Sequence, residues 1–163
     1  QGESLKIKTV TTTPYQDRSQ GPVVFERRLS LPIGELSLKL CLIYFQFNPK
    51  AEYEGKALVV SGDGRYWNAH ATRVCLHIAL TNGVKDVYIG GDNLLSTPAV
   101  SALIRKLNEQ HGPGHCFGGI VLSASHNPAG PEEDFGIKFN GSNGGPSLES
   151  VTEEIFAQSK VIS

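Results

Sequence analysis

The sequence predicts an α/β domain in three layers, because strand-like and helix-like segments alternate along it. Short apolar runs of strand length recur between longer segments whose apolar residues fall on one face of a helix. Eighteen glycines and nine prolines among 163 residues indicate many tight turns and ligand-facing loops, which a helical bundle does not need. Strands that are separated by helices form a sheet with helices packed on its faces, which is the three-layer arrangement.

The first predicted elements are two strands and a helix. Residues 5–10 alternate apolar and polar side chains as a half-buried strand does, and residues 57–60 form a short apolar strand before a Gly-Asp-Gly turn at 62–64. A helix is predicted from Trp67, and Gly83 closes it as a C-terminal glycine does. The apolar stripe of this helix consists of Trp67, Ala71, Val74, Cys75 and Ile78.

The middle of the chain predicts a strand at residues 86–90 and a second helix. Thr97 is expected to cap this helix and Pro98 to occupy its first turn. The apolar face of the helix consists of Val100, Leu103, Ile104 and Leu107. A Gly-Pro-Gly sequence at 112–114 stops the helix, and residues 119–122 form the next buried strand.

The last third predicts one more strand and one more helix. Residues 135–139 alternate and are expected to pair nearby as a hairpin. A helix is expected to begin at Ser147 or Ser150 and to end near Lys160. Residues 20–48 do not follow the alternating pattern, and their apolar run fits a strand and a buried helix equally.

The composition excludes several classes of protein. Hydrophobic residues make up 39% and charged residues 19%, with a net charge of -1, which gives no general attraction to nucleic acid or acidic membranes. Cys41, Cys75 and Cys116 are widely spaced and odd in number, as expected for reduced thiols in the cytosol. The polar start lacks a secretory signal, and the apolar run at 36–47 contains a lysine and is too short to span a bilayer. We therefore expect a cytoplasmic protein of one domain, residues 1–163, without a membrane anchor.

The loop at residues 123–128 holds the densest set of reactive groups. It follows a buried strand, and ligands of α/β sheets bind beyond the carboxyl ends of strands. A fixed hydroxyl such as that of Ser125 could carry a phosphoryl group, while Asn127 binds phosphate oxygens and Lys138 adds positive charge. The alternative is that Ser125 caps a turn and His126 is solvated. A Ser-His hydrolase pair is disfavoured, because sequence neighbours usually point apart and no Gly-x-Ser-x-Gly elbow is present.

Other polar segments are weaker candidates. Arg65 also follows a strand and could bind a substrate phosphate, but a structural Asp63–Arg65 pair that braces the turn is the favoured interpretation. The glycine-rich segment 141–145 lacks the Lys-Ser/Thr ending of a P-loop and is interpreted as a turn. The remaining histidines and the acidic run at 132–134 have no convincing metal partner and are expected on the solvated surface.

Several segments together resemble the eukaryotic phosphoglucomutases, which belong to the alpha-D-phosphohexomutase family. The most specific matches are Ser-Ala-Ser-His-Asn-Pro at 123–128, Asp-Phe-Gly-Ile-Lys-Phe-Asn at 134–140 and Ser-Asn-Gly-Gly-Pro at 142–146, similar in this order to the phosphoserine loop of the family. Further matches are residues 6–16, Gly-Asp-Gly-Arg at 62–65 and Leu-Ser-Thr-Pro-Ala-Val-Ser at 95–101. The resemblance covers most of the chain, with a gap from residue 20 to about residue 53.

The resemblance implies a fold and a reaction. The fold would be that of domain 1 of the phosphohexomutases, with a mixed β-sheet between helices. The activity would be the interconversion of glucose 1-phosphate and glucose 6-phosphate, with glucose 1,6-bisphosphate as the intermediate and activator. Ser125 would carry the phosphoryl group, and its phosphate would be a Mg²⁺ ligand. His126 and Lys138 would assist the transfer.

Two departures from the family bear on activity. The family has a Thr-Ser-Gly-Leu-Arg loop whose arginine serves the active site, and this motif is absent at residues 17–23. Arg18, Arg27 or Arg28 is a candidate replacement. The family enzyme also has four domains, and its other Mg²⁺ ligands and its sugar-specificity loop lie in domains that this chain lacks. We therefore expect further mutase domains in a parent protein, and little or no activity from this domain alone.

The main alternative is a non-catalytic relative, similar to parafusin-type proteins, that acts in secretion or as a phosphorylated scaffold. The missing arginine loop favours this alternative. Ser125, His126 and Lys138 favour the enzyme, because a scaffold has no chemical need for them. A plain phosphate-binding module is a third possibility.

Overall fold

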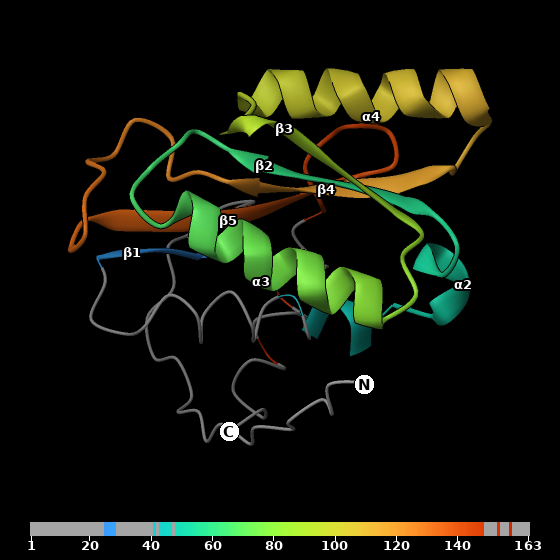
Figure 1. Ribbon diagram of the computed structural model, residues 1–163, viewed down its shortest axis with the longest axis horizontal. Helices are drawn as coiled ribbons and strands as arrows, with labels where there is room; N and C mark the ends of the chain where they lie inside the picture. Colours follow the sequence, from blue (N-terminus) through green and yellow to red (C-terminus); the bar gives the residue numbers. More distant parts are fainter. Residues whose placement is uncertain are drawn as a thin grey trace, which may run out of the picture.

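A computed structural model describes residues 25–28, 41, 43–46, 48–148, 153 and 157, with only the backbone for residues 25–28. Figure 1 shows the arrangement of the helices and strands. The predicted strand at 5–10 and the departure at 17–23 lie outside the described residues. Across the part of the chain that is described, no helix combines the length and the apolar character needed to cross a membrane.

The centre of the fold is a mixed sheet, in which the described strands follow the order β1-β5-β4-β2-β3. Its strands are β1 (Phe25–Arg28), β2 (Ala57–Gly62), β3 (Asp86–Leu94), β4 (Cys116–Leu122) and β5 (Asp134–Gly141). β2 pairs in parallel with β3 and β4, whereas β5 pairs antiparallel with β4 and β1. The predicted mixed sheet is therefore confirmed.

Helices cover both faces of this sheet, with α4 along one face and α3 along the other (Figure 1). The described helices are α2 (Lys50–Tyr53), α3 (Asn68–Thr81) and α4 (Thr97–His111). Leu58 and Val60 of β2 join the core that contains α3, whereas Val59 packs with Val100 and Ile104 of α4. Successive side chains of a strand point to opposite faces, so one buried strand supplies both cores. The predicted three-layer fold is confirmed.

Two strands are longer than their sequence patterns predict. β2 continues to Gly62, and β3 continues past the predicted end at residue 90, because Gly62 and Leu94 still pair. Asp92 and Asn93 have φ angles of 54° and 62°, in the left-handed region that side chains rarely adopt. Such residues are typical of turns, so local pattern alone ends this strand too early.

The C-terminal end of α3 agrees with prediction, whereas the N-cap of α4 differs by one residue. Gly83 has a φ of 93° directly after the C-cap of α3, as expected for a C-terminal glycine. The N-cap of α4 is Ser96, whose Oγ accepts a hydrogen bond from the Ala99 N–H at 3.4 Å. The prediction of Thr97 as the cap was wrong by one residue, because two adjacent hydroxyl side chains precede Pro98 and either could cap.

The apolar run that fitted a strand or a buried helix is helical where it is described. Residues 43–46 and Cys41 are helical, and the side chains of Ile43 and Phe45 are buried in the core beside α3. The thiol of Cys41 hydrogen-bonds to that of Cys75 at 2.9 Å. All three cysteines are buried and free.

The predicted hairpin is confirmed, since β4 and β5 pair antiparallel with Leu122 opposite Ile137. Residues 141–145 form a turn as predicted, in which the Gly144 N–H bonds to the Gly141 carbonyl at 2.9 Å. Ser147 is not helical, so the last helix does not begin there. Glu153 and Ala157 are helical and exposed, and the remainder of the predicted last helix lies outside the described residues.

Candidate functional site

The candidate site lies where β2 and β4 end. These strands are parallel neighbours with Gly62 opposite Leu122, so the loops that follow them start side by side. The Asp63 N–H bonds to the Leu122 carbonyl at 3.2 Å and ties the two loops together. An open pocket of about 390 Å³ lies between them, lined by Asp63, Gly64, Arg65, Ser125, His126, Asn127 and Ala129. The carboxyl edge of the sheet thus joins two motifs that are distant in the sequence.

Ser125 occupies an exposed and conformationally unusual corner of this pocket. Its φ angle is 57°, in the left-handed region, which costs a non-glycine residue on the order of 1 kcal/mol. Its hydroxyl oxygen accepts a hydrogen bond from Nζ of Lys138 at 2.7 Å. Lys138 lies in β5 opposite Val121 of β4, so the hairpin brings its amine back to the loop. The fold therefore brings together Ser125 and Lys138, two of the candidate residues named from the sequence.

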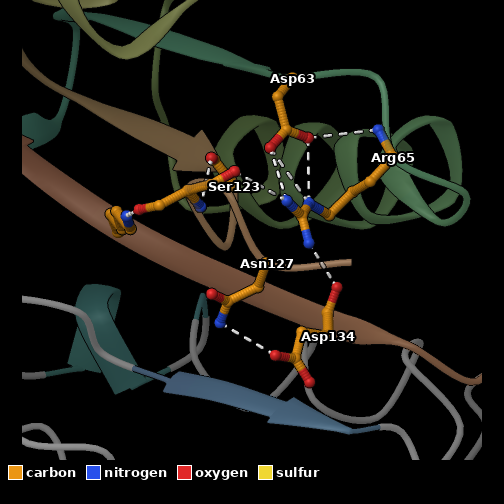
Figure 2. A network of polar contacts seen from close by, with 7 residues as sticks. Asp63, Arg65, Ser123, Asn127 and Asp134 are labelled. Carbon is orange, nitrogen blue, oxygen red and sulfur yellow. Dashed lines mark hydrogen bonds and ion pairs between the residues drawn. The ribbon is translucent and has the colours of Figure 1, made fainter. Parts of the chain in front are cut away.

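Asp63 and Arg65 form a bidentate ion pair beneath the loop. Nε of Arg65 lies 3.0 Å from Oδ1 and Nη2 lies 2.8 Å from Oδ2 of the carboxylate. The same guanidinium donates to the backbone carbonyls of Asp134 and, at 3.4 Å, of Ser125. Arg65 is buried, so the bracing pair that the sequence favoured is the geometry observed (Figure 2).

The surroundings of Asp63 keep its carboxyl group ionised. Burial by itself raises the pKa of this group. Hydrogen bonds from the side chain of Arg65, from Ser123 and from the Arg65 backbone, together with the charge of Arg65, outweigh burial, and the pKa of Asp63 lies below its ordinary value of 3.8. At neutral pH Asp63 is therefore ionised and holds the Arg65 guanidinium in place beside the loop.

The other two loop residues predicted for the site differ in their surroundings. His126 is exposed and lines the pocket. Asn127 is half-buried, and its side-chain amide donates to Oδ2 of Asp134 at 2.9 Å (Figure 2). The Asn127 backbone N–H bonds to the Ala124 carbonyl at 3.1 Å, which closes the turn around Ser125.

Sequence reasoning missed two residues that shape this loop. Ser123 is buried, and its Oγ accepts the backbone N–H of Ser125 at 3.0 Å. Gly136 of β5 lies so close that a Cβ there would overlap the carbonyl oxygen of Ser123. The sequence shows two serines in this loop, but only the strand pairing distinguishes the buried one from the exposed one.

The described residues do not make a Mg²⁺ site by themselves. Ser125 offers one oxygen, and both carboxylate oxygens of Asp63 are engaged by Arg65. Within the described ranges, no group of three His, Cys, Asp or Glu side chains is placed to hold a metal ion. The ring centroids of His111 and His115 lie 4.6 Å apart, and neither residue lines the pocket.

The fold and the site together define an α/β domain that presents a serine hydroxyl and a lysine amine at the carboxyl edge of its sheet. Residues 35–163 match the family described as phosphoglucomutase/phosphomannomutase, alpha/beta/alpha domain I. The chain belongs to this family, and the resemblance seen in the sequence is confirmed.

Comparison with individual relatives also supports membership of this family. The chain is 44% identical to a phosphoglucomutase of Rhizobium radiobacter, over 96% of this chain and 27% of that protein. It is also 44% identical to a cytoplasmic phosphoglucomutase of Bromus inermis, over 93% of this chain and 26% of that protein. The open-form crystal structure of the exocytosis-sensitive phosphoprotein parafusin from Paramecium, also titled a phosphoglucomutase, superposes with a TM-score of 0.82 at 37% identity, over 94% of this chain and 27% of that chain. This chain thus spans about a quarter of the length of the relatives it matches.

Proposed function

We propose that this chain is the phosphoryl-carrying domain of a phosphoglucomutase, in which Ser125 accepts and returns a phosphoryl group. The main support is the 2.7 Å contact between Nζ of Lys138 and Oγ of Ser125 at an exposed corner of the pocket. The names of the relatives support the same reaction. The proposed substrates are glucose 1-phosphate and glucose 6-phosphate, with glucose 1,6-bisphosphate as the intermediate and activator.

The proposed transfer uses groups of this chain and of the sugar phosphate. Oγ of Ser125 bonds to phosphorus as the bond between phosphorus and the sugar oxygen breaks. The serine proton passes to a base, and the protonated base returns a proton to the leaving sugar oxygen. His126, exposed at the pocket, is the candidate for that base. The ammonium group of Lys138 offsets the negative charge around the transferring group, which is the main demand of phosphoryl transfer. In the return step a sugar hydroxyl attacks phosphoserine and Ser125 regains a proton.

Arg65 and Asn127 are proposed to assist phosphate binding from the wall of the pocket. A guanidinium group has five N–H donors, and the contacts of Arg65 with described residues leave one N–H of Nη1 without an acceptor. The amide of Asn127 uses one of its two N–H groups on Asp134. Each side chain can therefore brace the loop and still offer one donor.

The complete activity is proposed for a parent protein that includes the remaining mutase domains. Mg²⁺ would be held through the serine phosphate together with ligands from those domains, and would offset charge on the phosphoryl group when bound. A cytoplasmic location is proposed from relatives so named, such as that of Bromus inermis, although a relative from Solanum tuberosum is chloroplastic. Fractionation of cells that express the tagged parent protein tests this location.

A non-catalytic, parafusin-like role is the second candidate. It is favoured by the structural likeness to the Paramecium phosphoprotein, whose title names exocytosis as well as phosphoglucomutase. In that role Ser125 would be phosphorylated without exchanging the phosphoryl group with sugars. Dependence of the phosphoserine on sugar phosphates distinguishes the two roles.

Intact-mass spectrometry of the full 163-residue chain tests the proposal. The chain is incubated with Mg²⁺ and glucose 1,6-bisphosphate, and the modified peptide is mapped. We expect one phosphoryl group on Ser125 that glucose 1-phosphate removes. Phosphate on another serine, or phosphoserine that sugar phosphates never remove, would contradict the proposal. Steady mutase turnover by this chain alone would show that the further domains are not required.

A further inference from the structure

Ser125 is held on both sides of its α-carbon. Its N–H donates to Oγ of Ser123 at 3.0 Å, and its carbonyl oxygen accepts from Nη2 of Arg65 at 3.4 Å. These two contacts fix the peptide groups that flank the left-handed residue. Arg65 is itself anchored by its ion pair with Asp63. Ser123 is one of the groups that lower the pKa of the Asp63 carboxyl.

The protons that each group carries decide which group donates in the hydrogen bonding of Ser123. A serine hydroxyl has one proton to donate, and an ionised carboxylate can only accept. Oγ of Ser123 accepts the N–H of Ser125, so the hydroxyl proton is available to turn toward the Asp63 carboxylate, which agrees with the lowered pKa of Asp63.

The position of Ser123 is itself fixed by the sheet. Its backbone N–H bonds to the Gly136 carbonyl at 2.9 Å, and the residue is 5% exposed. Ser123 is therefore held against β5 just before the exposed part of the loop begins. Its hydroxyl lies where it can select the left-handed conformation of Ser125 over the extended one, which side chains otherwise favour.

We infer that the Ser123 hydroxyl is a positioning residue that holds Ser125 in the conformation from which its Oγ meets Lys138. The inference rests on the proposed function for the role of Ser125 as the phosphoryl carrier. A hydroxyl that merely fills a buried polar space would make no difference to the Ser125 amide. The two roles are separated by replacing Ser123 with Thr, which keeps the hydroxyl, and with Val, which has the shape of Thr without it.

The first test follows amide hydrogen exchange by NMR in the full chain and in Ser123→Ala, Ser123→Thr and Ser123→Val. We expect the Ser125 amide to exchange at least about tenfold faster in the Ala and Val variants and at the native rate in Thr. The Gly144 amide, bound to the Gly141 carbonyl at the other end of β5, serves as the internal control and should not change. If Ser123→Ala fails to fold, the matched Thr and Val pair still decides the question. Equal exchange of the Ser125 amide in all folded variants would overturn the inference.

The second test is titration of Asp63 by NMR in the same proteins. Loss of the Ser123 hydroxyl should raise the pKa of Asp63 in the Ala and Val variants, because one hydrogen bond to the charged form is removed. The Thr variant should titrate as the native chain does. An unchanged pKa of Asp63 in the Val variant would contradict this role of the Ser123 hydroxyl.

The third test measures the rate of phosphoryl loading from glucose 1,6-bisphosphate. We expect loading to slow about ten- to a hundredfold in Ser123→Val and to recover in Ser123→Thr, because misplacement of a reacting group by about 1 Å costs that much. Equal rates in the native, Thr and Val chains would overturn the positioning role and leave the proposed function intact. A native chain that never loads would instead count against the proposed function, and the exchange and titration results would then decide the role of Ser123 alone.

Discussion

Nζ of Lys138 lies 2.7 Å from Oγ of Ser125, although the two residues are 13 positions apart. Lys138 is opposite Val121 in the antiparallel pairing of β5 with β4. The loop that follows β4 places Ser125 beside the Lys138 side chain. The contact therefore depends on the register of one hairpin. A shift of that register by one residue would move the amine to the other face of the sheet.

Removal of the Ser125 hydroxyl should abolish loading without unfolding the domain. Ser125 is exposed, and such a surface change is expected to alter the free energy of unfolding by no more than about 0.5 kcal/mol. Intact-mass spectrometry and thermal melting of Ser125→Ala test this. Ser142→Ala is the matched control, because Ser142 is also exposed, in the 141–145 turn. A collapsed melting temperature in Ser125→Ala would assign the serine a structural role.

Removal of the Lys138 amine should slow loading while the serine remains the acceptor. Loss of one preorganised charged donor at a reacting group costs on the order of a hundredfold in rate. The loading rate of Lys138→Ala from glucose 1,6-bisphosphate checks this, with the exposed Lys106→Ala as the control for a lost surface charge. A loading rate equal to that of the native chain would remove Lys138 from the site.

The Asp63–Arg65 pair should make the free energy of unfolding depend on pH in the acid range. The folded-state pKa of Asp63 is depressed, so its contribution is fully present above the ordinary pKa of 3.8 and is lost as pH falls through the folded value. At pH 7 Asp63→Asn leaves Arg65, whose side chain is 3% exposed, without its charge partner and should cost about 3 kcal/mol. Urea unfolding of both proteins at neutral and acid pH should show this gap shrinking below about pH 4. Glu109→Gln, at an exposed carboxylate, provides the control. A gap that stays constant with pH would show that the ion pair is not its source.

Because β5 approaches the loop closely, adding a single methyl group at Gly136 should lower stability and slow loading. A Cβ on Gly136 would overlap the Ser123 carbonyl oxygen and lie 3.1 Å from its carbon. Gly136→Ala should therefore cost about 1 to 3 kcal/mol and slow loading, because the loop must shift. Gly91→Ala is the control, since a Cβ there would meet nothing within 4 Å. Chemical unfolding and loading rates measure both effects, and equal stability of the two variants would contradict the close packing.

Much of the fold could be predicted from local pattern. The apolar run at 57–60 and the stripe beginning at Trp67 predict β2 and α3, because burial imposes the periodicity of each element on its sequence. The hairpin of β4 and β5 was also predicted. The contact between Ser125 and Lys138 depends on the register of that hairpin. The family was recognisable from the order of its motifs, and residues 35–163 confirm it.

What the sequence determined by itself is therefore the set of elements, the family and the loop that holds Ser125. The tertiary structure alone decided that residues 43–46 are helical, that β3 continues to Leu94 and that the Ser123 hydroxyl accepts the Ser125 N–H. The physical reason is the range of the interactions. Periodicity and turn residues report local burial and backbone preference, whereas strand register and hydrogen bonds between loops depend on partners that only folding brings together.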